Sequence, residues 1–175
     1  MGSASVHDPK ILDALCAIES TRFECTVYRA VFQGRDPTAG SFAGGRWSPP
    51  QTFETLYTSF SSEGAIAEVQ FHLEKQPIFS SVPVEVHELA IATSGTIDIS
   101  SDEACDALEL DDHALASLEY SRCQEIGHAI EFLGFDSFIV KSARCSSENL
   151  VIIVGNLLAK IDPVSFEVVD WSKYR

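Results

Sequence analysis

The chain has few basic residues, and this shortage argues against one class of function. Its 175 residues include 12 Lys+Arg against 26 Asp+Glu, which gives a formal net charge of -14 and a sequence pI of about 4.6. Such a charge opposes direct binding to the phosphate backbone of a nucleic acid. It favours a basic protein as partner instead.

Cysteine pairs at metal-binding or redox spacing are missing. The chain has no C-x-x-C motif and no run of histidines, and its five cysteines are odd in number and widely spaced. They are Cys16, Cys25, Cys105, Cys123 and Cys145. We therefore expect reduced core cysteines, no bound metal and a cytosolic location.

Long apolar runs are also missing. The longest uncharged apolar stretch, residues 150–159, is about half of the ~20 residues that a membrane span needs. The first residues lack the basic-then-apolar pattern of a signal peptide. We expect no membrane association.

Known catalytic signatures are missing as well. The chain has no G-x-G-x-x-G, Walker, G-x-S-x-G or H-E-x-x-H motif, which argues against a Rossmann nucleotide site, a hydrolase triad and a zinc site. The composition is otherwise ordinary, at 45% hydrophobic and 22% charged residues. The length fits one domain with a normal core.

Hydrophobic periodicity predicts helices and strands without a regular βαβ rhythm. Helices are expected over 8–20, 61–75 and 114–133, and strands over 25–32, 53–59, 82–92, 135–140, 150–154 and 165–169. This order favours an α+β fold, a single compact domain with a mixed β core flanked by helices. Residues 98–112 hold seven acids and no Lys or Arg, which fits either a solvated loop with a short helix or a docking surface for a basic partner.

A long segment without periodicity, residues 33–51, is rich in Gly, Pro and Ser. Loops of this length in compact domains are often functional. Four of the seven arginines lie between Arg22 and Arg46. Arginines in a glycine-rich segment can bind a phosphate, although scattered surface arginines explain the pattern equally well.

Glu68 stands out on the predicted helix 61–75. The exposed polar edge of that helix gathers Glu63, Gln70 and Glu74. Glu68 lies roughly 130° from this edge at about 100° per residue, so we expect it to be at least half buried. A buried carboxylate needs either a function or a partner such as a core arginine.

Two further polar residues have both an ordinary and a functional interpretation. Tyr57 follows the alternation of its strand, which is typical of a core tyrosine. Ser142 follows an apolar strand, where serines often form turns. Either side chain could also face a ligand.

Five pieces, the last of which is made of three short segments, form an ordered pattern along the chain. They are Val27-Tyr28-Arg29-Ala30, Gly44-Gly45-Arg46-Trp47-Ser48, Leu56-Tyr57-Thr58-Ser59, Glu63-Gly64-Ala65-Ile66-Ala67-Glu68, and Ile126-Gly127 with Lys141-Ser142-Ala143-Arg144 and Asn149-Leu150-Val151. This pattern resembles the RES domain family, which is named for Arg, Glu and Ser, from about residue 24 to 156. Residues 1–23 are then a helical extension, and residues 157–175 a C-terminal strand and tail packed on the same domain.

The resemblance implies a fold similar to ADP-ribosyltransferase toxins and a role as the toxin of a bacterial RES–Xre toxin–antitoxin pair. Members of the family consume NAD+ by phosphorolysis, by hydrolysis or by passing ADP-ribose to a protein. The catalytic residues that the resemblance implies are Glu68, Arg46 and Tyr57, and the NAD+-binding residues are Arg29, Tyr28, Trp47 and Ser142.

The resemblance also implies a role for most of these side chains. Glu68 would be the catalytic carboxylate, Arg29 and Arg46 would bind the phosphates, and Tyr57 would stack near the nicotinamide. Ser142 would line the pocket. Many relatives have proline just before this serine, where the present chain has Lys141.

The implied chemistry needs no metal and no cofactor beyond NAD+ as substrate. Cleavage of the nicotinamide–ribose bond has an oxocarbenium-like transition state, which a buried carboxylate stabilises. Inorganic phosphate is the expected co-substrate if the reaction is phosphorolysis. The expected partner is an Xre-type helix-turn-helix antitoxin in a homo- or hetero-oligomer, with no direct nucleic acid binding.

Three other functions remain open. The protein could be an ADP-ribosyltransferase with a specific protein target. It could be a catalytically silent module that docks a basic DNA-binding partner. It could also be a structural domain in which Arg29, Arg46 and Glu68 form a buried ion network.

Overall fold

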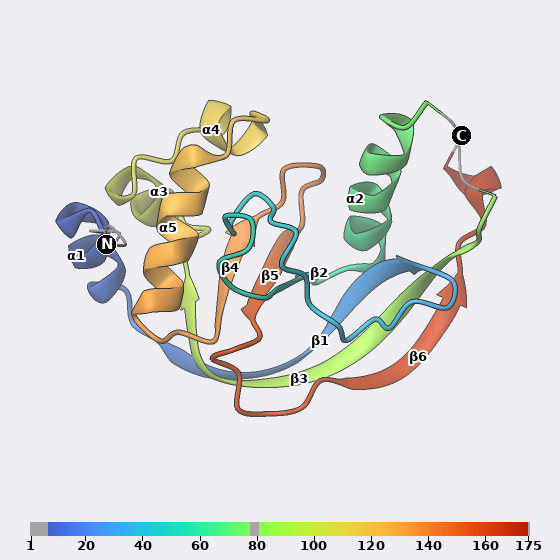
Figure 1. The fold of residues 1–175 in the computed structure, drawn as a ribbon, viewed down its shortest axis with the longest axis horizontal. Helices are drawn as coiled ribbons and strands as arrows, with labels where there is room; N and C mark the ends of the chain where they lie inside the picture. Colours follow the sequence, from blue (N-terminus) through green and yellow to red (C-terminus); the bar gives the residue numbers. More distant parts are fainter. Residues whose placement is uncertain (1–6, 78–80, 175) are drawn as a thin grey trace.

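Apolar alternation along six segments builds one mixed β-sheet in the computed structural model, which describes residues 7–77 and 81–174 (Figure 1). The strands are β1 (Thr21–Phe32), β2 (Thr55–Ser59), β3 (Val84–Asp98), β4 (Ser137–Lys141), β5 (Glu148–Ile153) and β6 (Asp162–Val168). Their order is β1-β2-β5-β4-β3-β6, with an additional pairing of β1 and β3. The expected single domain with a mixed sheet and helices is confirmed.

The sheet curls back on itself. β1 pairs antiparallel with β3 from Thr21↔Thr96 to Phe32↔Val84 and meets β2 at Tyr28↔Ser59. β5 pairs antiparallel with β2 and with β4, and β4 pairs in parallel with β3. The long β3 therefore connects the two ends of the strand order, and β6 pairs with its first half.

The helices form two groups above the sheet (Figure 1). One group gathers at the end of the molecule that holds the N-terminus, and α2 stands at the other end. The first group comprises α1 (Pro9–Cys16), α3 (Asp102–Ala107), α4 (Asp112–Ala116) and α5 (Ser121–Phe132), and the second has α2 (Ser62–Glu74), with the short 3-10 helix η1 (Trp171–Lys173) near it. The strands β2, β4 and β5 lie between the two groups.

The largest core cluster lies under the first helix group. Leu15 of α1, Ile126 and Ile130 of α5, and Phe138 of β4 all belong to it and are completely buried. Burying a side chain of this size stabilises the fold by roughly 1.5–3 kcal/mol. This cluster fixes α5 against β4 and, as shown below, supports one wall of a cleft.

The predicted helix 114–133 is wrong as a single element, because α4 ends at Ala116 and α5 starts at Ser121. Ser117 has an extended backbone with ψ 156. Its hydroxyl accepts a bond from Glu119 N at 2.9 Å, and the Glu119 carboxylate accepts one from Ser121 N at 2.9 Å. Such local side-chain bonds compete with the helical hydrogen bonds and break the helix.

The cysteine prediction is partly wrong. All five cysteines lie in the described residues and are free thiols, but only Cys105 and Cys123 are buried. Cys16 is exposed, and Cys25 and Cys145 are half-buried. Burial raises the pKa of the Cys25 thiol to about 11, so this thiol stays protonated at neutral pH.

Other element boundaries shift by a few residues. Helix α1 ends at Cys16 and not near Ser20, and β3 continues to Asp98 and not Ala92. The acidic interval 98–112 includes α3, and its apolar residues Leu108 and Leu110 are buried in the core.

Residues 1–6 of the predicted helical extension lie outside the described residues. No helix in the described part of the chain is long and apolar enough to cross a membrane.

Candidate active site

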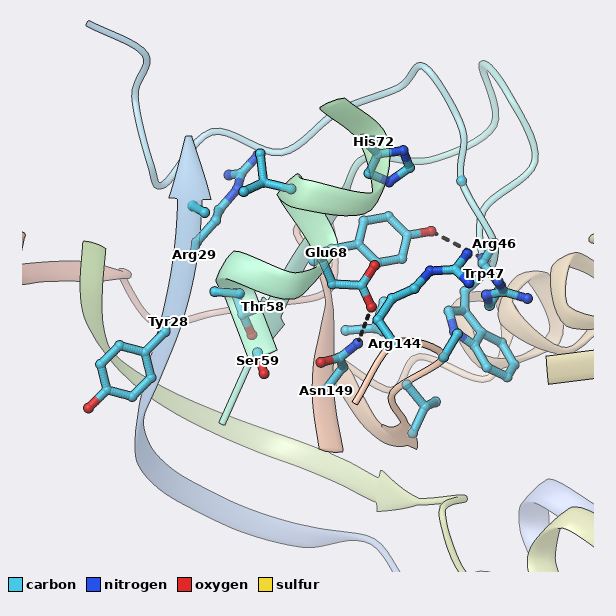
Figure 2. A pocket seen from close by; sticks show the side chains of 18 of the residues that line it. Tyr28, Arg29, Arg46, Trp47, Thr58, Ser59, Glu68, His72, Arg144 and Asn149 are labelled. Carbon is cyan, nitrogen blue, oxygen red and sulfur yellow. Dashed lines mark hydrogen bonds between the residues drawn. The ribbon is translucent and has the colours of Figure 1, made fainter. Parts of the chain in front are cut away.

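A cleft of about 440 Å³ separates α2 from the loop that precedes β2. Its lining comes from β1, the segment 44–47, β2, α2, β5, Tyr120, the end of β4 and the two residues Ala143 and Arg144. Six of the seven site residues predicted from the sequence line it, and only Ser142 does not. The structure therefore gathers side chains from segments that are far apart in the chain (Figure 2).

Glu68 projects from α2 into this cleft (Figure 2). Helix α2 begins at this place because the Ser61 side chain accepts a hydrogen bond from Gly64 N at 3.0 Å, which caps the first turn. A Cβ on Gly64 would lie 2.1 Å from Ser59 Oγ. Glycine at this position thus lets the helix start directly against the end of β2.

Two neutral groups hold the Glu68 carboxylate. Its Oε1 accepts hydrogen bonds from Asn149 Nδ2 at 3.3 Å and from Ser142 Oγ at 3.4 Å. Glu68 is partly buried, with an intermediate exposure, as its place on the helix predicts. No basic side chain in the described part of the chain forms an ion pair with it. The alternative prediction, a salt bridge between Glu68 and a core arginine, is therefore wrong.

The wall opposite α2 is the glycine-rich segment 44–48. Trp47 is 2% exposed and packs edge-on against Phe138, with ring centroids 5.6 Å apart. Its backbone N–H donates to Tyr57 Oη at 3.1 Å, and the same phenol contacts Ser48 Oγ at 3.0 Å. Burial raises the pKa of Tyr57, although these hydrogen bonds oppose the shift. The phenol therefore stays neutral and fastens the loop to β2.

A second contact fastens this loop to α5. A Cβ built on Gly127 would lie 1.8 Å from the carbonyl oxygen of Trp47. The helix and the loop backbone therefore touch, and any other residue at position 127 would push them apart.

Arg29 and Arg46 both line the cleft, and main-chain carbonyls hold each of them. Arg29 Nη1 donates to the carbonyls of Pro37 and Ala39 at 2.9 and 2.5 Å. Burial lowers the pKa of Arg29, while the charge of Asp36 opposes this shift. The first part of the glycine-rich loop is thus tied to β1 through Arg29.

Arg46 is held from the side of the first helix group. Its Nη1 donates to the carbonyl of Ser117 at 3.0 Å, and its guanidinium carbon lies 4.7 Å from the centroid of the Tyr120 ring. The break between α4 and α5 therefore provides the carbonyl and the ring that position this arginine. Arg22 and Arg35, the other two arginines of residues 22–46, do not line the cleft, so two of the four arginines meet there and the other two do not.

Tyr28 and Ser142 lie at the margins of the site. The Tyr28 ring points away from Glu68 in Figure 2, although the residue contributes to the lining. Ser142 contacts the Glu68 carboxylate and forms a turn, because its Oγ also accepts bonds from Arg144 N at 3.1 Å and Cys145 N at 3.3 Å. It is therefore both a turn former and a contact of Glu68.

The position of Lys141 explains why the segment before Ser142 tolerates a residue other than proline. Lys141 is the last residue of β4, where it pairs with Glu148 of β5. Its Nζ bonds Asp102 Oδ1 at 2.7 Å. The position before Ser142 is therefore the end of a strand, and its residue, Lys141, is held by a salt bridge.

Sequence reasoning missed Asn149 and Arg144 as site residues. Asn149 is half-buried near the start of the apolar strand β5, and its Oδ1 is buried without a hydrogen-bond partner in the described part of the chain. A polar residue in an otherwise apolar strand is the signal that could have identified it. Arg144 lies in the segment 141–144 of the ordered pattern described above, which is the signal that could have identified it.

Comparisons with known proteins agree on one family. The family model of the RES domain matches residues 26–171. The chain is 27% identical over 125 residues to proteins named NAD(+) phosphorylase MbcT from Mycobacterium tuberculosis and Mycobacterium bovis, which covers 67% of this chain and 67% of each relative.

The fold also has a solved counterpart. A crystal structure of the M. tuberculosis MbcT-MbcA toxin-antitoxin complex contains a chain that superimposes with a TM-score of 0.85 at 21% sequence identity. The match covers 95% of this chain and 96% of that one. The two folds are therefore the same over nearly their whole length.

Proposed function

The chain belongs to the RES domain family, whose model matches residues 26–171, and on that premise we propose that it is a toxin that degrades NAD+. The enzyme cleaves the bond between nicotinamide and ribose and transfers ADP-ribose to inorganic phosphate or to water. The relatives named NAD(+) phosphorylase support phosphate as the acceptor.

One observation carries this proposal: the Glu68 carboxylate projects into a cleft that Arg29 and Arg46 also line. The cleft combines a carboxylate, which stabilises positive charge, with arginines, which bind phosphate groups. NAD+ can use both kinds of group. Its pyrophosphate is anionic and suits the arginines, and its ribose becomes cationic when nicotinamide leaves and suits the carboxylate.

In this mechanism Glu68 stabilises the oxocarbenium character that develops on the ribose. The hydrogen bonds from Asn149 and Ser142 fix its orientation before substrate binds, and such pre-organisation is where electrostatic catalysis gains most. The buried Asn149 Oδ1 without a partner can accept a hydrogen bond from a ribose hydroxyl. Nicotinamide leaves as a neutral molecule, so no second acid is needed.

The remaining site residues position the substrate. Arg29 and Arg46 bind the pyrophosphate, and this remote clamp orients the bond that breaks. Tyr57 faces the nicotinamide with its neutral ring. Trp47 and Tyr28 shape the two edges of the cleft, Trp47 mainly as a buried support of the loop.

We further propose that an antitoxin with an Xre-type helix-turn-helix domain neutralises the protein. The structural counterpart is part of a toxin-antitoxin complex, and the net charge of -14 suits a basic DNA-binding partner. The site of action is the cytosol. The kinship of the fold with ADP-ribosyltransferase toxins stays a prediction of the family resemblance.

The decisive experiment incubates the purified protein with NAD+, with and without inorganic phosphate, and separates the products by chromatography with mass detection. Nicotinamide together with phosphorylated ADP-ribose, formed only when phosphate is present, identifies a phosphorylase. Plain ADP-ribose under both conditions identifies a hydrolase.

Two other outcomes contradict this proposal. ADP-ribose that appears on a macromolecule would identify a protein ADP-ribosyltransferase. NAD+ that stays intact, together with tight and salt-sensitive binding of a basic partner, would identify a silent docking module.

A further inference from the structure

Arg144 differs from the other two arginines of the cleft. Arg29 and Arg46 each donate to main-chain carbonyls. The guanidinium of Arg144 makes no hydrogen bond or ion pair in the described part of the chain, and its Nε is buried without a partner. A buried donor without an acceptor is unfavourable unless a ligand satisfies it.

A ring holds Arg144 in place instead. The guanidinium carbon of Arg144 lies 3.3 Å from the centroid of the Phe71 ring on α2. This stacking restrains the plane of the guanidinium and occupies none of its N–H donors. The side chain lines the cleft, so its donors are available to an anion there.

The backbone places Arg144 beside the catalytic carboxylate. The Ser142 hydroxyl accepts a bond from Arg144 N at 3.1 Å and donates to Glu68 Oε1 at 3.4 Å. One hydroxyl thus links the loop of Arg144 to Glu68. Figure 2 shows Arg144, Glu68 and Asn149 in the same part of the cleft.

A phosphate acceptor needs a cation at this place, whereas a water acceptor does not. A phosphate dianion that approaches the ribose next to Glu68 is repelled by the carboxylate. Lys141, the last residue of β4, also lines the cleft, but its Nζ pairs with Asp102 Oδ1 at 2.7 Å. Arg29 and Arg46 already donate to main-chain carbonyls, so Arg144 is the arginine of the cleft whose N–H donors have no acceptor among the described residues and can offset this repulsion.

We propose that Arg144 binds the inorganic phosphate that attacks the ribose, an inference that rests on the function proposed above. An oxygen of the phosphate donates an electron pair to the ribose carbon that carries nicotinamide. The carbon–nitrogen bond breaks and its electron pair goes to the nicotinamide ring, which leaves neutral. The products are nicotinamide and ADP-ribose with a phosphate ester on that carbon, and the phosphate keeps its own proton.

The kinetic test compares wild-type protein with Arg144→Gln while inorganic phosphate is varied at saturating NAD+. The expected result is a KM for phosphate that rises at least about tenfold, with a KM for NAD+ that changes less than about twofold. Arg144→Lys keeps the charge without the planar stacked fork and should give an intermediate KM for phosphate.

The matched control is Lys75→Gln. Lys75 Nζ lies 3.8 Å from the centroid of the same Phe71 ring, but Lys75 does not line the cleft. This variant removes one positive charge from the ring and should keep the wild-type KM for phosphate. An Arg144→Gln protein with a raised KM for NAD+ and an unchanged KM for phosphate would assign Arg144 to the dinucleotide and overturn the proposal.

A binding measurement keeps this inference separate from the proposed function. The 31P NMR line of inorganic phosphate is recorded with wild-type and Arg144→Gln proteins whose folding is checked by circular dichroism. Wild-type protein should broaden the line much more than the variant. Equal broadening, or none by either protein, overturns the phosphate site, whereas a wild-type protein that binds phosphate and leaves NAD+ intact overturns only the proposed function.

Discussion

The two walls of the cleft are built in different ways. Helix α2 forms from local interactions, with Ser61 as its cap and Gly64 against β2, and it presents Glu68. The opposite wall, residues 44–48, has no regular structure, and distant groups hold it through Tyr57 and Gly127. In the proposed function the helix wall therefore supplies the chemistry, and the loop wall supplies the position of the substrate.

Removal of the carboxylate from the helix wall should have the largest effect. Glu68→Gln keeps the size of the side chain but loses the charge that stabilises the oxocarbenium ion, so kcat for NAD+ cleavage should fall about 1,000-fold. The KM for NAD+ should change little. Glu74→Gln, on the exposed end of the same helix, is the control, and a Glu68→Gln protein with wild-type turnover would remove Glu68 from the mechanism.

A methyl group placed between the loop wall and α5 should have the next largest effect. Gly127→Ala puts a Cβ 1.8 Å from the carbonyl oxygen of Trp47, so the free energy of unfolding should fall by about 1–3 kcal/mol. Urea denaturation measures this change. Gly155→Ala, whose Cβ would meet nothing within 4 Å, is the matched control, and equal stability of the two variants would contradict the close contact.

A change in the loop wall that spares the fold should affect binding more than chemistry. Arg46→Gln removes the charge that the Ser117 carbonyl positions in the cleft. The KM for NAD+ should rise roughly tenfold, with a much smaller change in kcat. Steady-state kinetics check this expectation. A fall in kcat at constant KM would place Arg46 in the chemical step.

The smallest effect is expected for the hydrogen bonds between the loop wall and β2. Tyr57→Phe removes the hydroxyl that bonds Trp47 N and Ser48 Oγ, which should lower the free energy of unfolding by about 1 kcal/mol. Urea denaturation at neutral pH tests this change. An unchanged stability would mean that the loop is held without the phenol.

The same variant makes a prediction about pH. Because burial raises the pKa of Tyr57, the folded protein binds this proton more tightly than the unfolded chain does. The resulting stability is present below about pH 10 and is lost as the pH rises through the folded pKa. Wild-type protein should therefore lose stability more steeply than Tyr57→Phe above about pH 10, and parallel pH profiles would contradict the buried phenol.

The same difference between the walls explains what the sequence could predict. The cap at Ser61 and the helical spacing of residues 61–75 are local, so the helix and the direction of Glu68 could be predicted. The strand that carries Tyr57 was also expected, with a start two residues too early. These features depend on neighbours along the chain.

The rest of the site depends on contacts between distant segments. The position of Arg46 depends on the carbonyl of Ser117, which is available because the helix predicted over 114–133 breaks there. The stacking of Arg144 on Phe71 joins residues 73 positions apart (144 minus 71). No periodicity in the sequence encodes either contact, so both became visible only in the folded structure.

The place of β5 in the sheet has a consequence for the timing of activity. Strand β5 occurs late in the sequence, yet it lies between β2 and β4 and supplies Asn149. A growing chain that stops before residue 148 lacks the strand that fills the place between β2 and β4, and a ladder made of such distant segments forms slowly. On the proposed function, the ribosome therefore completes most of the protein before any NAD+ can be cleaved, which gives an antitoxin time to meet the folding chain.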